Sequence, residues 1–125
     1  MWIGGIDHLV LVVSNIETTK NFYEVFLGPV EEAWDDRLLF LVGEVKLFLV
    51  LPYGKLPEGD KFSPNRIGLE HFAFRMESLD DLKDIEWKLN QWKIKHSEIH
   101  IDEHSQKEKI WLNDPDGIRI EFYLR

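Results

Sequence analysis

The hydrophobic and polar residues follow a pattern that occurs twice along the chain. Residues 6–13 are a run of apolar and β-branched side chains with few polar interruptions, which predicts a strand. In residues 14–28, Ser14 and Glu17 have the spacing of a capping box, and Gly28 stands where a helix would end. The predicted buried face of this helix consists of Thr19, Phe22, Tyr23 and Phe26.

The second half of the chain repeats this order. Gly5-Ile6-Asp7-His8 recurs as Gly68-Leu69-Glu70-His71, each a glycine, an aliphatic residue, an acid and a histidine. Residues 69–76 predict a strand, and Ser78 predicts the start of a helix. The apolar stripe of that helix is formed by Leu82, Ile85, Leu89 and Trp92. A period covering half the chain indicates two copies of one supersecondary unit.

Short strands are expected after each helix. The first copy predicts them at 30–34, 37–42 and 45–51, and the second at 99–101, 109–112 and 118–124, with turns at 43–44 and 113–117. Between the copies, a segment rich in proline and glycine reads as a linker. We therefore expect an α+β fold of two βαβββ modules in a single domain, with module one at about 1–52, the linker at about 53–66 and module two at about 67–125.

Strand alternation decides which side chains face away from the helices. It puts His8, His71 and Glu121 on that opposite face of three separate strands. A carboxylate between Ile120 and Phe122 is costly to desolvate unless it is paired or bound. Two imidazoles and one carboxylate suit a divalent transition metal and leave open coordination positions. A merely solvated sheet face is the alternative, but the equivalent places of the two histidines favour the metal site.

Composition and net charge limit the kinds of partner that we expect for this chain. The 125 residues carry a formal charge of −8 and have no basic stripe. Because such a chain would repel a phosphate backbone, we expect no nucleic acid partner. There is no cysteine, which excludes disulfides and thiolate chemistry. Apolar runs are too short to cross a membrane, and the start of the chain lacks the pattern of a targeting signal. We expect a cytoplasmic protein.

Several motifs resemble the vicinal oxygen chelate superfamily, which includes glyoxalase I, extradiol dioxygenases, fosfomycin-resistance enzymes and bleomycin-resistance proteins. These motifs are residues 6–13, 21–23, 27–28, 68–74 and 114–122. The resemblance implies paired modules whose mixed sheets curl into a metal-binding cup. It implies one divalent transition metal (Zn, Ni, Co, Mn or Fe) held by His8, His71 and Glu121, and a homodimer. The fourth ligand of glyoxalase I, commonly a glutamate, would fall on Phe48, whose phenyl ring cannot bind a metal.

The resemblance also suggests which residues would contact a substrate. Tyr123 is a candidate catalytic donor, in place of the tyrosine that extradiol enzymes carry on the preceding strand. Arg119, a second candidate catalytic residue, and Arg75 could orient an anionic group, or else form framework salt bridges. Phe48, Arg75 and Trp111 are expected in the substrate pocket, with Trp34 also at its wall.

Two functions from different classes are compatible with these residues. The first is a metal-dependent enzyme, of glyoxalase-like lyase or isomerase type or of dioxygenase type, acting on a small molecule chelated through vicinal oxygens. The alternative is a metal-free protein that sequesters a small molecule, as bleomycin-resistance proteins do. His96, His100 and His104 are expected to be loop and edge residues outside the site.

Overall fold

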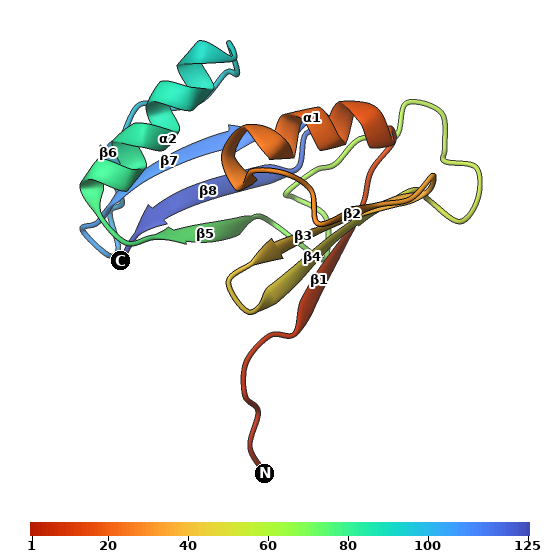
Figure 1. The fold of residues 1–125 in the computed structure, drawn as a ribbon, viewed down its shortest axis with the longest axis horizontal. Helices are drawn as coiled ribbons and strands as arrows, with labels where there is room; N and C mark the ends of the chain where they lie inside the picture. The colour runs from red at the N-terminus through yellow and green to blue at the C-terminus, as the bar shows by residue number, and fades with distance from the viewer. The chain divides into compact units, whose positions relative to one another are not determined.

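The computed structural model describes residues 1–125, which form two compact units, Met1–Asp60 and Lys61–Arg125. Each unit contains one helix and a four-stranded mixed sheet in the order strand, helix and three strands (Figure 1). This confirms the predicted α+β fold of two βαβββ modules.

In the first unit, a parallel pair of strands is extended by antiparallel strands. Its elements are β1 (His8–Val12), α1 (Ile16–Leu27), β2 (Glu32–Ala33), β3 (Arg37–Val42) and β4 (Val45–Val50). The sheet order is β1-β4-β3-β2, with β1 parallel to β4 and the other neighbours antiparallel. The first and last strands of the βαβββ unit therefore lie side by side.

The second unit has the same topology. Its elements are β5 (Phe72–Met76), α2 (Leu79–Gln91), β6 (His100–Ile101), β7 (Glu108–Asn113) and β8 (Arg119–Leu124). The sheet order is β5-β8-β7-β6, with β5 parallel to β8. Four strands are shorter than the sequence predicts, because ladder pairing continues only as far as a partner strand extends. They are the strands predicted at 6–13, 30–34, 69–76 and 99–101.

The helix ends correct two details of the sequence prediction. The N-cap of α1 is Asn15, not Ser14, since the Asn15 side chain accepts a hydrogen bond from the Thr18 amide at 2.9 Å. Gly28 ends α1 at φ 80°, a left-handed conformation that glycine adopts without a Cβ clash. Ser78 caps α2 as predicted, whereas Trp92 lies past the helix end and is 69% exposed, so it does not extend the buried stripe.

Each unit buries one face of its sheet beneath its helix. In the first unit the buried side chains include Leu11, Val13, Tyr23, Phe26, Leu38, Phe40, Leu47 and Leu49. In the second they include Leu82, Ile85, Leu89, Ile110, Leu112, Ile118, Ile120 and Phe122. Each such side chain contributes roughly 2 kcal/mol of hydrophobic free energy. Phe22, predicted to be buried, is only half-buried and contacts Tyr23 and Phe26 edge-on.

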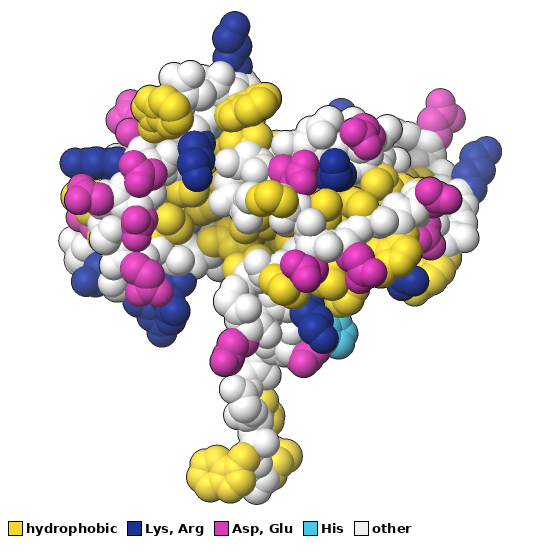
Figure 2. All heavy atoms as spheres, viewed as in Figure 1, with side chains coloured by type: hydrophobic (Ala, Val, Ile, Leu, Met, Phe, Trp, Pro, Cys, Tyr) yellow, Lys and Arg dark blue, Asp and Glu magenta, His cyan; other side chains and the backbone are white.

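The surface carries charges of both signs. On the face drawn in Figure 2, Lys and Arg side chains lie singly among Asp and Glu. The arm that precedes β1 ends in exposed hydrophobic side chains at Met1, Trp2 and Ile3. Neither helix has the length and apolar character needed to cross a membrane.

Candidate functional site

Glu121 is a buried carboxylate at the centre of the second sheet. It lies on β8, the strand between β5 and β7, opposite Ala73 on one side and Trp111 on the other. Because Ile120 and Phe122 point toward α2, alternation turns Glu121 to the face away from the helix. The residue is nevertheless only 6% exposed, so its charge must be matched by neighbouring groups.

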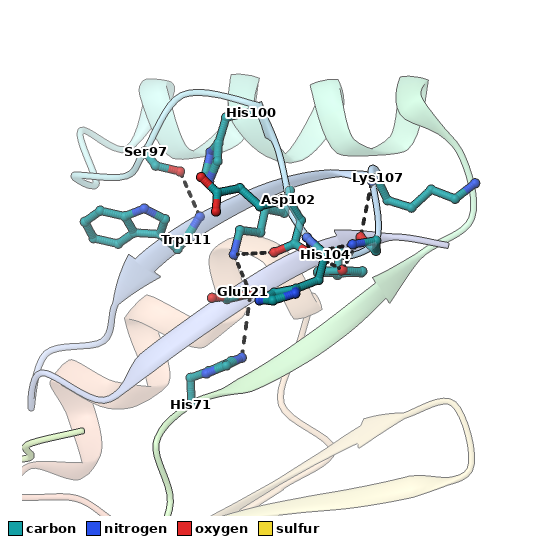
Figure 3. A network of polar contacts seen from close by, with 12 residues as sticks. His71, Ser97, His100, Asp102, His104, Lys107, Trp111 and Glu121 are labelled. Carbon is teal, nitrogen blue, oxygen red and sulfur yellow. Dashed lines mark hydrogen bonds and ion pairs between the residues drawn. The ribbon is translucent and has the colours of Figure 1, made fainter. Parts of the chain in front are cut away.

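His71, just before β5, presents one ring nitrogen to this carboxylate. Its Nε2 lies 3.6 Å from Glu121 Oε1 (Figure 3), while its Nδ1 lies 2.5 Å from Glu70 Oε1. A carboxylate can only accept, so Nδ1–H donates to Glu70, and in the neutral form of the ring the lone pair is therefore on Nε2. Two ligands of one tetrahedral ion, each about 2.1 Å from it, lie about 3.4 Å apart. The spacing of His71 and Glu121 is therefore compatible with two ligands of the same metal.

His8 has the same arrangement in the first unit. Its Nδ1 lies 2.7 Å from Asp7 Oδ1, so the preceding acid again orients the ring. The hydrogen bond with His8 and, next, the charge of Lys46 hold the pKa of Asp7 below its usual value. Histidines that bind metals commonly have such a carboxylate on the second ring nitrogen. The duplicated acid–histidine pair therefore leaves Nε2 of both rings as a potential ligand atom.

Lys109 is the main counter-charge of Glu121, and sequence reasoning missed it. Its Nζ lies 3.5 Å from Glu121 Oε1 and 3.1 Å from Asp102 Oδ1. Burial acts to lower the pKa of Lys109, but the hydrogen bond to Asp102 and the charge of Glu121 outweigh it and raise the pKa. Lys109 is two residues from Trp111 on β7, so strand alternation would have placed it on the same face as Glu121.

Asp102 joins this network from the loop after β6. The Ser105 backbone N–H, followed by the Lys109 ammonium and the Tyr123 hydroxyl, holds the pKa of Asp102 far below its usual value. Tyr123, the candidate donor, directs its hydroxyl to Asp102 Oδ2 at 3.0 Å and to Ser105 Oγ. The Tyr123 hydroxyl is therefore already hydrogen-bonded to the 102–107 loop.

The two candidate arginines differ in their surroundings. Arg119 lies over the ring of Trp111, with its guanidinium carbon 4.3 Å from the ring centroid, on the same face as Glu121. Arg75 forms an ion pair with Glu77 at 2.9 Å and its side chain is 61% exposed. By strand alternation, six predicted site residues of the second unit lie on or beside one face of its sheet, namely His71, Arg75, Trp111, Arg119, Glu121 and Tyr123.

Phe48 occupies the place in the first sheet that Glu121 occupies in the second. Phe48 lies opposite Val10 and Leu39, as Glu121 lies opposite Ala73 and Trp111. It contacts His8 edge-on, with ring centroids 6.2 Å apart. A cavity of about 520 Å³ opens on this face. It is lined by His8, Val10, Asp36, Arg37, Phe48, Val50, Leu51, Pro52 and Tyr53.

The predicted metal site remains a prediction. The structure gathers no group of three or more His, Cys, Asp or Glu side chains that could hold a metal. His71 and Glu121 form a two-member pair in the second unit, and His8 belongs to the first.

The remaining candidate residues lie elsewhere. Trp34 is stacked on Arg37 and is absent from the cavity lining. The ring of His96 contacts Asn90 and the Ser97 carbonyl, and His100 contacts the Glu98 carbonyl.

Comparisons with known proteins agree with this architecture. The chain is 26% identical over 127 residues to the uncharacterised protein YaeR of Escherichia coli strain K12, covering 94% of each chain. It superposes on a glyoxalase family protein of Enterococcus faecalis with a TM-score of 0.75 at 26% identity, covering 98% of this chain and 99% of that one. Lactoylglutathione lyase of Agrobacterium tumefaciens shares the fold, with a TM-score of 0.75 at 16% identity over 98% of this chain and 94% of that one.

A family model matches residues 5–122 and therefore covers both modules with their candidate ligands. The chain belongs to the Glyoxalase/Bleomycin resistance protein/Dioxygenase superfamily.

Proposed function

We propose that this protein is a divalent-metal-dependent enzyme acting on a small molecule that carries two adjacent oxygens. His8, His71 and Glu121 are its proposed ligands, with the metal being Zn, Ni, Co, Mn or Fe. The observation that carries the proposal is the pair formed by His71 Nε2 and Glu121 Oε1, 3.6 Å apart on the polar face of the second sheet. Belonging to a superfamily that includes metal enzymes supports it.

The donor chemistry fits such an ion. In both modules the acid before the histidine, Asp7 or Glu70, accepts from Nδ1 and fixes the tautomer that offers Nε2. Glu121 adds one negative charge from a buried position. Two neutral imidazoles and one carboxylate are ligands that divalent transition metals accept.

Residues around the pair would handle the substrate. A metal bound there would supply a Lewis acid that stabilises negative charge developing on two chelating oxygens. Arg119, stacked on Trp111, has donors on the same face as Glu121 and would orient an anionic substrate group. Trp111 would form part of the pocket wall. Tyr123 would act as a donor only after its hydroxyl leaves Asp102.

Phe48 affects which reaction is compatible with the site. A carboxylate at this position would supply both a fourth ligand and a base, and a phenyl ring supplies neither. The proposed three-ligand set leaves more open positions for the substrate, as a chelated catechol or a chelated hemithioacetal would require. We propose a lyase, isomerase or dioxygenase reaction within that limit. We also propose a cytoplasmic homodimer, which sedimentation at micromolar concentration tests directly.

The test combines metal content with activity. Gently purified protein should contain about one transition metal per proposed site, and His71→Ala should lose it, because one of three ligands is removed. His104→Ala is the matched control, since the His104 side chain is exposed in the 102–107 loop. Metal-loaded protein would then be assayed with 2-oxoaldehyde hemithioacetals, catechols and fosfomycin. Wild-type protein without stoichiometric metal, even after incubation with these ions, would overturn the proposal.

A metal-free ligand-binding protein is the second candidate. It is favoured by Lys109, whose ammonium lies 3.5 Å from Glu121 and provides a counter-charge without a metal. This candidate predicts that a small-molecule ligand binds His71→Ala as tightly as wild type. Loss of ligand affinity together with loss of metal would exclude it.

A further inference from the structure

The cavity of the first unit combines an apolar floor with a cation at its rim. Val10, Phe48 and Val50 lie on the face of β1 and β4 that is turned away from α1. Arg37, the first residue of β3, lies opposite Val50 and lines the same cavity. The volume of about 520 Å³ is in the range of small-molecule sites. Such a surface suits a molecule with an apolar body and a charged end.

Arg37 is held in place without being neutralised strongly. Its guanidinium carbon lies 4.8 Å from the ring centroid of Trp34, which supports the planar group from one side. Its only ion pair is with Asp36, where the Nε to Oδ1 distance is 3.8 Å and the side chains are 51% and 74% exposed. An exposed pair of this length contributes little. Most of the five N–H donors of the guanidinium therefore remain available to a ligand.

Comparison of the two modules shows which residue of the second unit corresponds to Arg37. Arg37 precedes Leu39 by two residues, as Lys109 precedes Trp111, and Leu39 and Trp111 lie opposite Phe48 and Glu121. Arg37 and Lys109 are therefore equivalent cations of the duplicated unit.

The two cations differ in what surrounds them. Lys109 is matched by the carboxylates of Glu121 and Asp102. At the position of Glu121 the first module has Phe48, so the equivalent internal carboxylate is missing. A ligand could supply it.

We propose that this cavity binds a small organic carboxylate, with Arg37 binding the carboxylate and Val10, Phe48 and Val50 contacting a flat apolar body. Arg binds a carboxylate through two parallel hydrogen bonds, which fixes the ligand's orientation. Asp36 beside Arg37 and the net charge of −8 favour a single negative charge over two. The inference rests on the proposed function in one respect, since it takes this carboxylate as the substrate class of the enzyme.

The test measures binding to the full chain in the presence of EDTA, so that no metal is needed. The probes are 3-phenylpropionate and its neutral analogue 3-phenylpropionamide, titrated while backbone amide resonances are followed by NMR. We expect saturable binding of the carboxylate, with shifts at Val10, Phe48 and Val50. Arg37→Met should weaken that affinity by about tenfold, equivalent to roughly 1.4 kcal/mol, and leave the affinity for the amide within about twofold of wild type.

Three further variants sharpen the result. Arg37→Lys keeps the charge but loses the planar fork, so it should fall between wild type and Arg37→Met. Asp36→Asn removes the neighbouring negative charge and should tighten carboxylate binding a fewfold. Lys83→Met, on the exposed side of α2, removes one positive charge elsewhere and should change nothing. Unchanged affinity for the amide in Arg37→Met shows that the cavity is still folded.

The result is distinguishable from a failure of the metal hypothesis. If Arg37→Met binds the carboxylate as tightly as wild type, or if the amide binds wild type equally well, the inference is wrong even when metal binds stoichiometrically. If the protein holds no metal but loses the carboxylate in Arg37→Met, the enzymatic proposal fails and the carboxylate site stands. Absence of saturable carboxylate binding in the millimolar range would also overturn the inference.

Discussion

Replacing Lys109 with methionine would leave the buried carboxylate of Glu121 without its ammonium partner. The two charged atoms lie 3.5 Å apart, and the side chains of Lys109 and Glu121 are 18% and 7% exposed. At an effective dielectric constant of about 20, their attraction is roughly 5 kcal/mol. Reorganisation and water entry recover part of this, so we expect Lys109→Met to lower the free energy of unfolding by about 3 kcal/mol.

A double-mutant cycle isolates the contribution of Glu121. Urea unfolding in EDTA would be measured for wild type, Lys109→Met, Glu121→Gln and the double variant. Glu121→Gln removes the buried charge, so in that background Lys109→Met should cost only about 1 kcal/mol, the share due to Asp102. A cost for Lys109→Met below about 0.5 kcal/mol, or an equal cost in both backgrounds, would mean that Lys109 does not stabilise the charge of Glu121.

Three smaller predictions concern the caps, the core and the loop. Asn15→Ala should lower the free energy of unfolding by about 1 kcal/mol, because it removes the acceptor of the Thr18 amide. Asn15→Asp keeps an acceptor and should leave the stability unchanged. Urea denaturation measures both variants. Thr19→Val should raise the free energy of unfolding by about 1 kcal/mol, since Thr19 Oγ1 is buried without a hydrogen-bond partner, and a loss of stability would contradict this. The pKa of Asp102 is depressed in the folded state, chiefly by the Ser105 N–H and then by Lys109. The carboxylate therefore makes its full contribution to the free energy of unfolding above the unfolded-state pKa of about 4, and this contribution is lost as the pH falls below that value. The stability difference between wild type and Asp102→Asn should therefore shrink from about pH 5 to pH 2, and a constant difference would exclude this account.

The duplicated topology could be predicted because it follows from local patterns of residues in the sequence. The recurrence of glycine, aliphatic residue, acid and histidine at Gly5 and Gly68 marks equivalent strands, and each strand is followed by a helical period. Alternation then assigned Glu121 to the polar face, which the structure bears out. The equivalence of Phe48 and Glu121, inferred from matching their strands, agrees with the register of both sheets.

Other features depended on side-chain geometry that no periodicity encodes. Ser14 and Asn15 are both good caps, and the sequence alone does not decide which residue leaves the helical conformation first. Trp92 has helical spacing, yet α2 ends before it because Lys93 adopts a left-handed φ of 55°. The partner of Lys109 in the 102–107 loop, Asp102, could not be found from periodicity, since loops of this kind have none.

X-ray absorption spectroscopy of the full chain loaded with cobalt(II) would identify the ligands of the proposed metal site. We expect one bound ion with about two imidazole ligands and further oxygen ligands. His8→Ala and His71→Ala should each lower the imidazole count by one, whereas His104→Ala leaves it unchanged. A spectrum that shows no bound ion, or an imidazole count unchanged by His8→Ala or by His71→Ala, would mean that these residues do not form the proposed metal site.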